Sequence, residues 1–422
     1  MSLSSMSRLA RITGRIIFAA ILAMMPTTLV SAATAKAVTG SVGPGVPPFT
    51  VRPGYRVTLV AKGIANCRFL EFDGHGRLFV SEPGPGRILV LSDKNHAGYY
   101  TRRATFLHGF DRVQAMVFRD GWLWFATSTG IYKTPDDGTQ SSAGKVTTIL
   151  TGLPGDSGHW WRSLCVTRKH LYTSVGDQGN IDPWHSAADI MKTDREKIWR
   201  YNLDGTGKTL WCTGIRNTEK LLFRPATHEL WGCDEGSDQF GHPLGEAWPH
   251  QAITDHNPPD EFNDYIRGGF YGHPFITGND VPRYEYVKSF EKTGHPNIIK
   301  LAGETVVPAY DFGAHWSTVS FCFFGDNKFH GAKTGDAMVC CHGSWDSVKL
   351  VGYRLQLVKF DPWTGKPDGS QLMVSTLGDQ GKKVLARPVN CLEDTDGSVI
   401  FSSDTSGSIY RLAWVGTKGV AH

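Results

Sequence analysis

The stretch Asp73-Gly74-His75-Gly76-Arg77-Leu78-Phe79-Val80 places a tight turn directly before an apolar triplet. Aspartate and glycine favour tight turns, and short apolar runs between such turns are typical of strands. The triplet decides the fold because it recurs, at residues 78–80, 123–125, 171–173, 230–232, 337–339 and 399–401. Most copies lie 45 to 62 residues apart, and one interval is 107 residues long.

Six copies of one unit predict six sheets of about four strands each. Several triplets lead into a second strand pattern, at residues 87–91, 130–133, 197–202, 354–360 and 408–414. A radial arrangement of such sheets leaves only short, protected edges. We therefore expect an all-β fold, a six-bladed β-propeller with four-stranded antiparallel blades, as a single domain over residues 51–415. A β-sandwich is the alternative.

Two further segments belong to this prediction. The early strand pattern at residues 56–60 is expected to complete the last blade and close the ring. The interval of 107 residues is expected to carry an insertion at about 240–310, which is rich in Pro, His and Asp. Long loops on a rigid scaffold commonly shape binding sites, so this insertion should lie over the functional mouth of the propeller.

The amino terminus has the pattern of a secretory signal peptide over residues 1–33. Arg8, Arg11 and Arg15 form a basic segment, residues 16–25 form an apolar run, and Val30-Ser31-Ala32 is a small-residue cleavage site. The apolar run is too short to span a bilayer permanently. We expect a periplasmic or secreted protein with a flexible segment at 34–50 and no membrane span after cleavage; an uncleaved anchor is the alternative.

Composition and charge exclude several classes of protein. Glycine makes up 48 of 422 residues and 40% of residues are hydrophobic, so disorder and a small disulfide scaffold are excluded. The leader holds three Arg and no acidic residue, so its removal lowers the formal net charge from +4 to +1, which argues against nucleic acid as a partner. The eight cysteines lack CxxC or CxxCH spacing, and both disulfides and buried thiols remain open.

Polar residues begin the strand that we expect to be innermost in each blade. These segments are Asn66-Cys67-Arg68, Arg112-Val113-Gln114, His159-Trp160-Trp161-Arg162, Arg216-Asn217, His315-Trp316-Ser317 and Arg387-Pro388. Equivalent positions of a propeller converge at one mouth of its central tunnel, so the sequence predicts a site for an anionic ligand there. The alternative for Arg216 and Arg387 is a structural ion pair.

Several motifs together resemble the soluble glucose/sorbosone dehydrogenases, six-bladed propellers that use pyrroloquinoline quinone (PQQ). They are Gly158-His159, Val175-Gly176-Asp177-Gln178-Gly179-Asn180, Gly214-Ile215-Arg216-Asn217, Asp234-Glu235-Gly236-Ser237 and Gly268-Gly269-Phe270-Tyr271-Gly272-His273-Pro274. His342-Gly343-Ser344-Trp345, Gly352-Tyr353 and Arg387-Pro388-Val389 resemble the sorbosone and pyranose dehydrogenase branch. The resemblance runs from about residue 50 to residue 414.

The resemblance implies a role for individual residues. It aligns His159 with the general base, Arg216 and Asn217 with residues beside the quinone, and Arg387 with a carboxylate-binding arginine. The carbonyls of Gly236 and Ser237 fall where the family binds catalytic Ca²⁺. No residue aligns with the family's PQQ-binding lysine, for which His342 and Trp345 are candidate substitutes. The candidate substrate contacts are Gln114, Trp160, Gln178 and His315, with core packing as the alternative for Trp160.

The expected chemistry suits these residue types. PQQ is a planar quinone with three carboxylates, and arginine both pairs with carboxylates and stacks on planar rings. A neutral histidine suits removal of a hydroxyl proton while hydride leaves carbon, and Ca²⁺ takes oxygen ligands. We therefore expect a PQQ-dependent oxidoreductase that oxidises a sugar (sorbosone-, glucose- or pyranose-like) and passes electrons to a separate cytochrome, quinone or dye.

Two other classes of function remain open. One is a Ca²⁺-dependent propeller lactonase or hydrolase in which His159 activates water. That chemistry usually needs carboxylates and amides around the metal, whereas the converging residues in this sequence are mainly cationic. The other is a non-catalytic propeller that binds a ligand or a protein.

Overall fold

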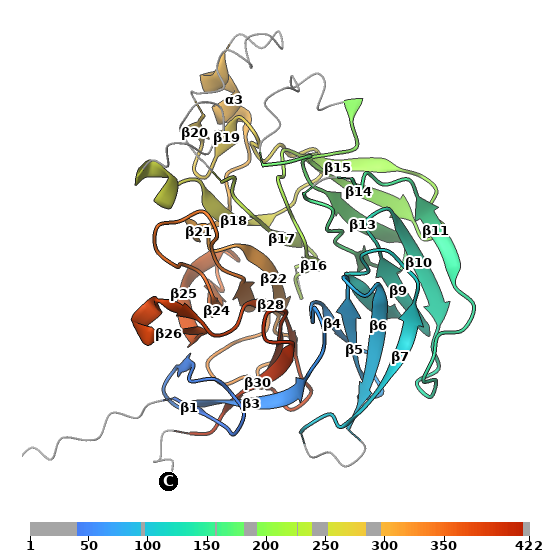
Figure 1. The fold of residues 1–422 in the computed structure, drawn as a ribbon. Coiled ribbons are helices and arrows are strands. Elements are labelled where there is room, and N and C mark those ends of the chain that lie inside the picture. Colours follow the sequence, from blue (N-terminus) through green and yellow to red (C-terminus); the bar gives the residue numbers. More distant parts are fainter. Residues whose placement is uncertain are drawn as a thin grey trace, which may run out of the picture. The chain divides into compact units, whose positions relative to one another are not determined.

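The computed structural model of the chain describes residues 40–93, 98–156, 158–180, 192–225, 227–238, 252–283 and 297–416. The expected signal peptide, residues 1–33, lies outside these residues. The chain divides into Met1–Ala37 and Val38–His422, and the second unit contains all of the described residues. Within them, six sheets of four or more strands form the expected six-bladed β-propeller (Figure 1).

The first three blades each consist of four consecutive antiparallel strands. Blade I is β4 (Leu70–Phe72), β5 (Leu78–Glu82), β6 (Arg87–Ser92) and β7 (Arg102–His108). Blade II is β8 (Met116–Arg119), β9 (Trp122–Ala126), β10 (Gly130–Pro135) and β11 (Thr147–Thr151). Blade III is β12 (Cys165–Val166), β13 (His170–Val175), β14 (Lys197–Asn202) and β15 (Thr209–Thr213).

The other three blades contain longer connections or additional strands. Blade IV is β16 (Leu221–Phe223), β17 (Leu230–Asp234), β18 (Pro259–Asp264) and β21 (Tyr310–Ala314). Blade V is β22 (Thr318–Phe323), β23 (Ala337–Cys341), β24 (Arg354–Phe360) and β25 (Pro367–Ser375), extended by β2 (Thr50–Val51). Blade VI is β28 (Pro388–Glu393), β29 (Val399–Ser403), β30 (Ser408–Trp414) and β3 (Tyr55–Lys62), extended by β1 (Ser41–Val42).

The ring closes through the early strand, as the sequence predicts. β3 pairs antiparallel with β30, so residues from the two ends of the described chain share one sheet. β1 and β2 then pair with the outer strands β3 and β25, which covers two edges that would otherwise present unpaired backbone groups.

The apolar triplets form the second strand of every blade, where the side chains are buried on both faces. Strand β5 is buried along its whole length, and β17, β23 and β29 are too. The six main apolar clusters each join neighbouring blades; one packs Phe69 and Phe79 of blade I against Leu123 and Phe125 of blade II. Burial between blades therefore holds the ring together, since these sheets make no hydrogen-bonded ladder with one another.

The segment expected as an insertion also contributes to a blade. Its residues Pro259–Asp264 form β18, the third strand of blade IV, which pairs with β17 and β21. Around this strand lie a 3-10 helix (Ala252–Asp255), the hairpin β19 (Ile276–Thr277) and β20 (Val281–Pro282), and helix α3 (Ile298–Glu304) (Figure 1). A second hairpin, β26 (Leu377–Gly378) and β27 (Lys383–Val384), joins blades V and VI.

The sequence left disulfides and buried thiols open for the eight cysteines. In the structure all eight are buried free thiols. None of the described helices has the length and apolar character needed to cross a membrane.

Candidate functional site

Antiparallel pairing determines which loops meet at the mouth of the propeller. In each blade the second strand runs antiparallel to the first, so residues just after the second strand lie beside residues just before the first. The mouth is therefore built from the six polar segments expected from the sequence and from a second set of loops. This second set follows β13, β17, β23 and β29 and includes Asp177, Glu235, His342 and Asp404.

Blades I, II, IV and VI are connected at the mouth through buried ion pairs and hydrogen bonds, and a cation–π contact adds blade III. Arg68 donates to Glu219 at 2.8 Å and to Asp404 at 3.1 Å, and its guanidinium lies 3.8 Å from the ring centre of Trp161. The amide of Gln114 donates to the same carboxylate of Glu219 at 3.1 Å. Burial raises the pKa of Glu219 to about 7, against the opposing effect of Arg68.

The Arg216-Asn217 segment is held in place by acidic residues of the next loop. Asp234, the last residue of β17, accepts hydrogen bonds from the peptide N–H groups of both Arg216 and Asn217 at 2.8 Å. The Arg216 guanidinium donates to Asp238 at 3.2 Å, and the Asn217 amide donates to Glu235. Arg216 therefore has an acidic partner, which is the ion-pair alternative that the sequence left open.

The far side of the mouth contains His342 and Arg387. His342 Nε2 lies 2.9 Å from Asp404, and the Arg387 guanidinium donates to the carbonyls of His342 at 3.3 Å and Gly343 at 3.1 Å. Burial opposes ionisation of Asp404, but His342, Arg68 and Arg387 outweigh it and lower its pKa. Within the described residues the Arg387 guanidinium has only carbonyl hydrogen-bond partners, so it can also bind an anionic ligand.

His159 and Asp177 form a hydrogen-bonded pair at the edge of blade III. His159 Nδ1 lies 2.8 Å from Asp177 Oδ1, the carboxylate is fully buried, and 13% of the histidine side chain is exposed. Burial opposes ionisation of Asp177, but His159 and His273 outweigh it and lower its pKa. In the described part of the chain Nε2 has no hydrogen-bond partner. The pair can therefore accept a proton at Nε2.

The close approach of two loops at this pair requires a glycine. A Cβ at Gly176 would lie 2.8 Å from the Cβ of His159 and 2.7 Å from the carbonyl oxygen of Arg216. Any other residue would displace the base or the segment beside it. The Gly176-Asp177 turn therefore sets the distance between His159 and the Arg216 backbone.

The Gly236-Ser237 turn has the oxygen donors that a hard cation requires. Asp260 accepts from the Gly236 N–H at 2.9 Å and from the Thr318 N–H at 3.0 Å, which holds the turn against blade V. Burial and the nearby Glu235 raise the pKa of Asp260 to about 7. No described residue donates to the carbonyl oxygens of Gly236 and Ser237, so both are available to a cation. Carbonyl and carboxylate oxygens are the usual ligands of Ca²⁺.

The donor set also fits an anionic planar ligand at the mouth. Three arginines, Arg68, Arg216 and Arg387, belong to the mouth segments, and Arg68 Nε and Gln114 Oε1 are buried without a hydrogen-bond partner in the described residues. The acids Glu219, Asp238 and Asp404 offset much of this positive charge. The sequence-based view of a mainly cationic mouth is therefore wrong, because it did not include the loops that follow the second strands.

Several candidate residues occupy positions that differ from the expected ones. Trp345 is 72% exposed, which is not the environment of a residue enclosing a cofactor. Gln114 is 1% exposed and points at Glu219, so it does not face a substrate. His315 is buried, with Nδ1 3.2 Å from Asp238 and Nε2 2.5 Å from the Thr254 carbonyl. Burial lowers the pKa of His315, but the contacts with Asp238 and the Thr254 carbonyl outweigh it and raise the pKa. Both ring nitrogens are engaged inside the protein, so His315 does not face a substrate.

The other two candidate substrate contacts remain accessible. Trp160 is half-buried and lies against Trp161 with ring centres 3.5 Å apart, while Arg112 lies 4.9 Å from its ring centre. Gln178 is exposed on the turn after Asp177. Both positions allow contact with a bound sugar beside His159.

Four acidic residues of the mouth that we did not predict from the sequence share one feature, their position in the blade. Asp177, Glu235, Asp238 and Asp404 all follow the second strand of a blade within four residues. That position could have been read from the apolar triplets alone. Glu219 and His273 carry no comparable signal, because they reach the mouth from the Arg216 segment and from the segment after β18.

Two relatives with curated sequences share similarity with this chain. A pyrroloquinoline quinone-dependent sugar dehydrogenase of Hypocrea jecorina is 24% identical over 405 residues, covering 85% of this chain and 88% of the relative. An uncharacterized protein of Borreliella burgdorferi is 24% identical over 259 residues. This chain spans only 60% of the length of that second relative.

Solved structures and a family model match most of the chain. A calcium structure of the Trichoderma reesei carbohydrate-active enzyme family AA12 has a TM-score of 0.73 and 20% identity, covering 88% of this chain and 98% of that one. The holo form of the pyranose dehydrogenase PQQ domain from Coprinopsis cinerea has a TM-score of 0.69 and 18% identity, covering 88% and 100%. The expected resemblance is thereby confirmed. Because the model described as TrAA12-like matches residues 49–415, the chain belongs to the TrAA12-like family.

Proposed function

We propose that the protein is a PQQ-dependent sugar dehydrogenase that uses His159 as its general base. The observation that carries the proposal is the His159–Asp177 pair, in which His159 Nε2 has no partner among the described residues. The pair lies at the mouth of the propeller, beside the Arg216 backbone. The names of the Hypocrea jecorina relative and of the Coprinopsis cinerea structure support the same cofactor and substrate class.

The residues that would hold PQQ are Arg387 and Asn217, with His342 beside them. Arg387 has only carbonyl hydrogen-bond partners within the described residues, so it can bind a carboxylate. Arg68 is already paired with Glu219 and Asp404. When bound, PQQ supplies the quinone that accepts hydride from the sugar. Arg216 contributes mainly by shaping this region, because Asp238 and Asn180 already occupy its guanidinium.

His159 would move the proton in the reaction. Asp177 accepts the Nδ1–H and so leaves Nε2 as the nitrogen that takes the hydroxyl proton of the sugar. The buried negative charge of Asp177 then stabilises the imidazolium that forms. The half-buried Trp160 and the exposed Gln178 flank this position and would contact the sugar ring.

The Gly236-Ser237 turn would hold Ca²⁺ through its two carbonyls, with Glu235 beside it. A cation held there would act as a Lewis acid toward the bound quinone. The calcium structure of the Trichoderma reesei protein supports this choice of ion. Electrons would leave to a separate acceptor, and the leader at residues 1–33 supports a periplasmic or secreted location for the mature protein.

Reconstitution of the purified mature protein tests the proposed function. PQQ and Ca²⁺ are added to the protein, the quinone absorbance is followed, and reduction of a dye is measured with a panel of aldoses. We expect stoichiometric PQQ binding and sugar-dependent dye reduction that disappears in His159→Ala. Binding of PQQ without dye reduction by any sugar would contradict the proposed activity.

A Ca²⁺-dependent hydrolase is the second candidate, and one observation favours it. Glu235, Asp238 and Asp260 surround the Gly236-Ser237 turn, which gives the cation more carboxylates than the sequence alone suggested. Hydrolysis of a sugar lactone with Ca²⁺ and without PQQ, lost on chelation, would establish this function in place of the first.

A further inference from the structure

A backbone pairing outside the blades brings His273 to the mouth. The segment after β18 runs alongside the end of β15: the Thr213 N–H donates to Gly269, the Tyr271 N–H to Thr213, and the His273 N–H to Gly214, at 2.9 to 3.0 Å. A Cβ at Gly214 would lie 2.7 Å from the nitrogen of Gly272, so this close approach requires glycine at position 214. The position of His273 is therefore set by main-chain contacts.

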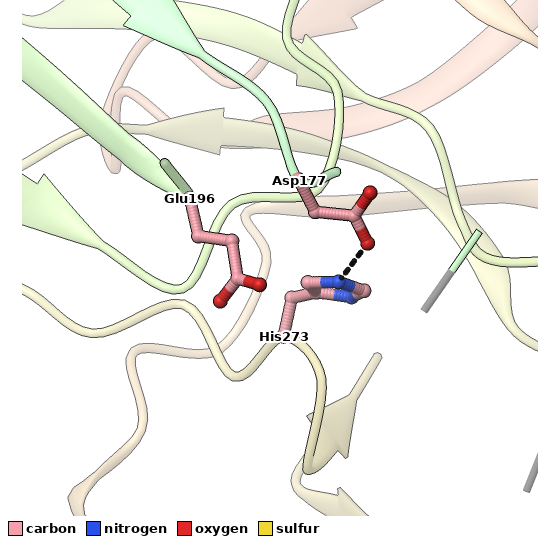
Figure 2. A group of neighbouring side chains, drawn as sticks. All are labelled: Asp177, Glu196 and His273. Atoms are coloured by element: carbon pink, nitrogen blue, oxygen red, sulfur yellow. Dashed lines mark hydrogen bonds and ion pairs between the residues drawn. The ribbon is translucent and has the colours of Figure 1, made fainter. Parts of the chain in front are cut away.

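Two histidines share the carboxylate of Asp177. His273 Nε2 lies 2.9 Å from Oδ2, and His159 Nδ1 lies 2.8 Å from Oδ1 (Figure 2 shows the contact with His273). Asp177 is fully buried and the His273 side chain is 9% exposed. The two rings approach the carboxylate through different nitrogens, which come from sequence positions 114 residues apart.

The geometry determines where the protons lie. A charged carboxylate only accepts hydrogen bonds, so each histidine must donate. His273 is then the Nε2–H tautomer and His159 the Nδ1–H tautomer. Burial lowers the pKa of His273 despite the contact with Asp177, so the ring is neutral at neutral pH. The charged groups that face His273 are Asp177, Glu196, Arg216 and Arg283, and Figure 2 shows Glu196 beside the same ring.

We propose that His273 is a positioning residue for the reaction: by donating to Asp177 Oδ2 it orients the carboxylate so that Oδ1 keeps His159 in the Nδ1–H tautomer. The inference rests on the proposed function, since the tautomer matters only if His159 Nε2 accepts a proton. A neutral donor suits this role because it leaves the charge on Asp177 for the imidazolium of His159. A cationic donor in the same place would neutralise that charge.

Three substitutions at position 273 separate orientation from packing. The amide nitrogen of glutamine is the closest match to Nε2 of histidine, whereas that of asparagine corresponds to Nδ1 and does not reach Asp177. We expect His273→Leu and His273→Asn to lower kcat roughly 10-fold to 100-fold, the usual cost of losing a partner that orients a working side chain, with KM and PQQ affinity nearly unchanged. His273→Gln should recover most of kcat.

A purely structural role of His273 gives a different pattern. It would lower kcat, PQQ affinity and the melting temperature together, and glutamine would rescue no better than asparagine. Either of these results would overturn the proposal. Equal kcat in all four proteins would overturn it as well.

A measurement on the apoprotein separates this inference from the proposed function. In protein labelled with ¹⁵N-histidine, two-bond ¹H–¹⁵N spectra distinguish the two tautomers, and the His159 signals are assigned from their loss in His159→Ala. We expect a single Nδ1–H tautomer of His159 in the wild type and in His273→Gln, and a mixture in His273→Leu. An unchanged single tautomer in His273→Leu would refute the role of His273 whether or not any sugar is oxidised.

A metal ion is the competing occupant of the same cluster. Asp177, Glu196 and His273 each offer a ligand atom, and these atoms lie within 4.8 Å of one another. Native mass spectrometry should show the same bound ions in the purified wild-type protein and in His273→Gln. One equivalent of a transition metal lost in that variant would replace the hydrogen-bond role with a metal site.

Discussion

Two of the histidine–aspartate pairs at the mouth, His159–Asp177 and His342–Asp404, differ in which histidine nitrogen is engaged. His159 uses Nδ1 to contact Asp177 and leaves Nε2, the nitrogen farther from its backbone, available. His342 uses Nε2 to contact Asp404, so its outer nitrogen is occupied. Both pairs lie beside the candidate cofactor site, yet only one places a proton acceptor at the end of the side chain. The choice of nitrogen, and not the presence of histidine, distinguishes a base from a structural residue.

The second partner of each aspartate adds to this difference. Asp404 also accepts from the cation Arg68, whereas Asp177 also accepts from His273, whose pKa is lowered by burial. The charge of Asp404 is therefore already balanced before any proton arrives. At Asp177 the second partner is a neutral ring, which does not by itself cancel the negative charge that can stabilise an imidazolium at His159. The surroundings thus suit one pair to proton transfer and the other to holding the structure.

The largest expected difference between the two pairs is in turnover. His159→Ala should lower kcat roughly 10²-fold to 10⁴-fold, the usual contribution of a positioned acid–base group, while PQQ and Ca²⁺ still bind. His342→Ala should change PQQ affinity more than kcat. Dye reduction under saturating PQQ measures kcat, and titration of PQQ by quinone absorbance measures its affinity. Equal rates for His159→Ala and wild type would eliminate His159 as the base.

Substitution of the two aspartates should also lower kcat more in the His159 pair than in the His342 pair. We expect this difference to be smaller than the one between the two histidine variants. Asp177→Asn places an amide where His159 needs an acceptor for Nδ1–H, so we expect kcat to fall on the order of 10²-fold or more. Asp404→Asn keeps a partner for His342 and should lower kcat less than tenfold. Steady-state kinetics at saturating sugar compares them, and a larger kcat loss in Asp404→Asn would reverse the assignment of the two pairs.

Cofactor affinity distinguishes the two arginines at the edges of the mouth. Arg387 has only carbonyl partners in the described residues, so Arg387→Ala should weaken PQQ binding about 10-fold to 100-fold, the range for a charged hydrogen bond. Arg216 already pairs with Asp238, so Arg216→Ala should affect stability more than affinity. Titration of PQQ by quinone absorbance tests this; wild-type affinity in Arg387→Ala would show that Arg387 does not hold the cofactor.

The smallest expected effect concerns stability and pH at Glu219, which shares Arg68 with Asp404. Burial raises the pKa of Glu219 from 4.5 to about 7, so between these values the folded state binds more protons than the unfolded state. The free energy of unfolding therefore falls as pH rises through this range. Glu219→Gln should reduce that fall by about 1–3 kcal/mol, measured by urea unfolding from pH 5 to pH 8.

Asp404 provides the matched control for that measurement, because the sign is opposite. Its pKa is lowered in the folded protein, so its contribution to stability is present above the ordinary range near 4 and is lost only as pH falls below it. The carboxylate of Asp404 itself therefore adds nothing to the slope between pH 5 and pH 8, and Asp404→Asn alters that slope only through its neighbours His342 and Arg68. A slope that does not change in Glu219→Gln would show that Glu219 is ionised in the folded protein throughout this range.

The sequence alone determined the repeating part of this protein. The turn that begins at Asp73 depends on local backbone preferences, and the apolar triplet that ends at Val80 depends on burial of its side chains. Both can be read along the chain. Six repeats then required a closed ring, and the register of the repeats placed Arg68, His159, Arg216 and Arg387 near one mouth. The family resemblance came from the same segments, which are continuous in sequence.

Only the tertiary structure decided how those residues are used. Asp177, Glu219 and Asp404 become partners of the mouth residues because antiparallel pairing and ring closure bring together positions up to 336 residues apart. The same packing buries Gln114 and His315 and leaves Trp345 exposed. His273 reaches Asp177 only through its pairing with the end of β15. Which nitrogen of a histidine is engaged, and whether an arginine already has an acid beside it, depends on distances between blades, and a repeat pattern carries no information on these distances.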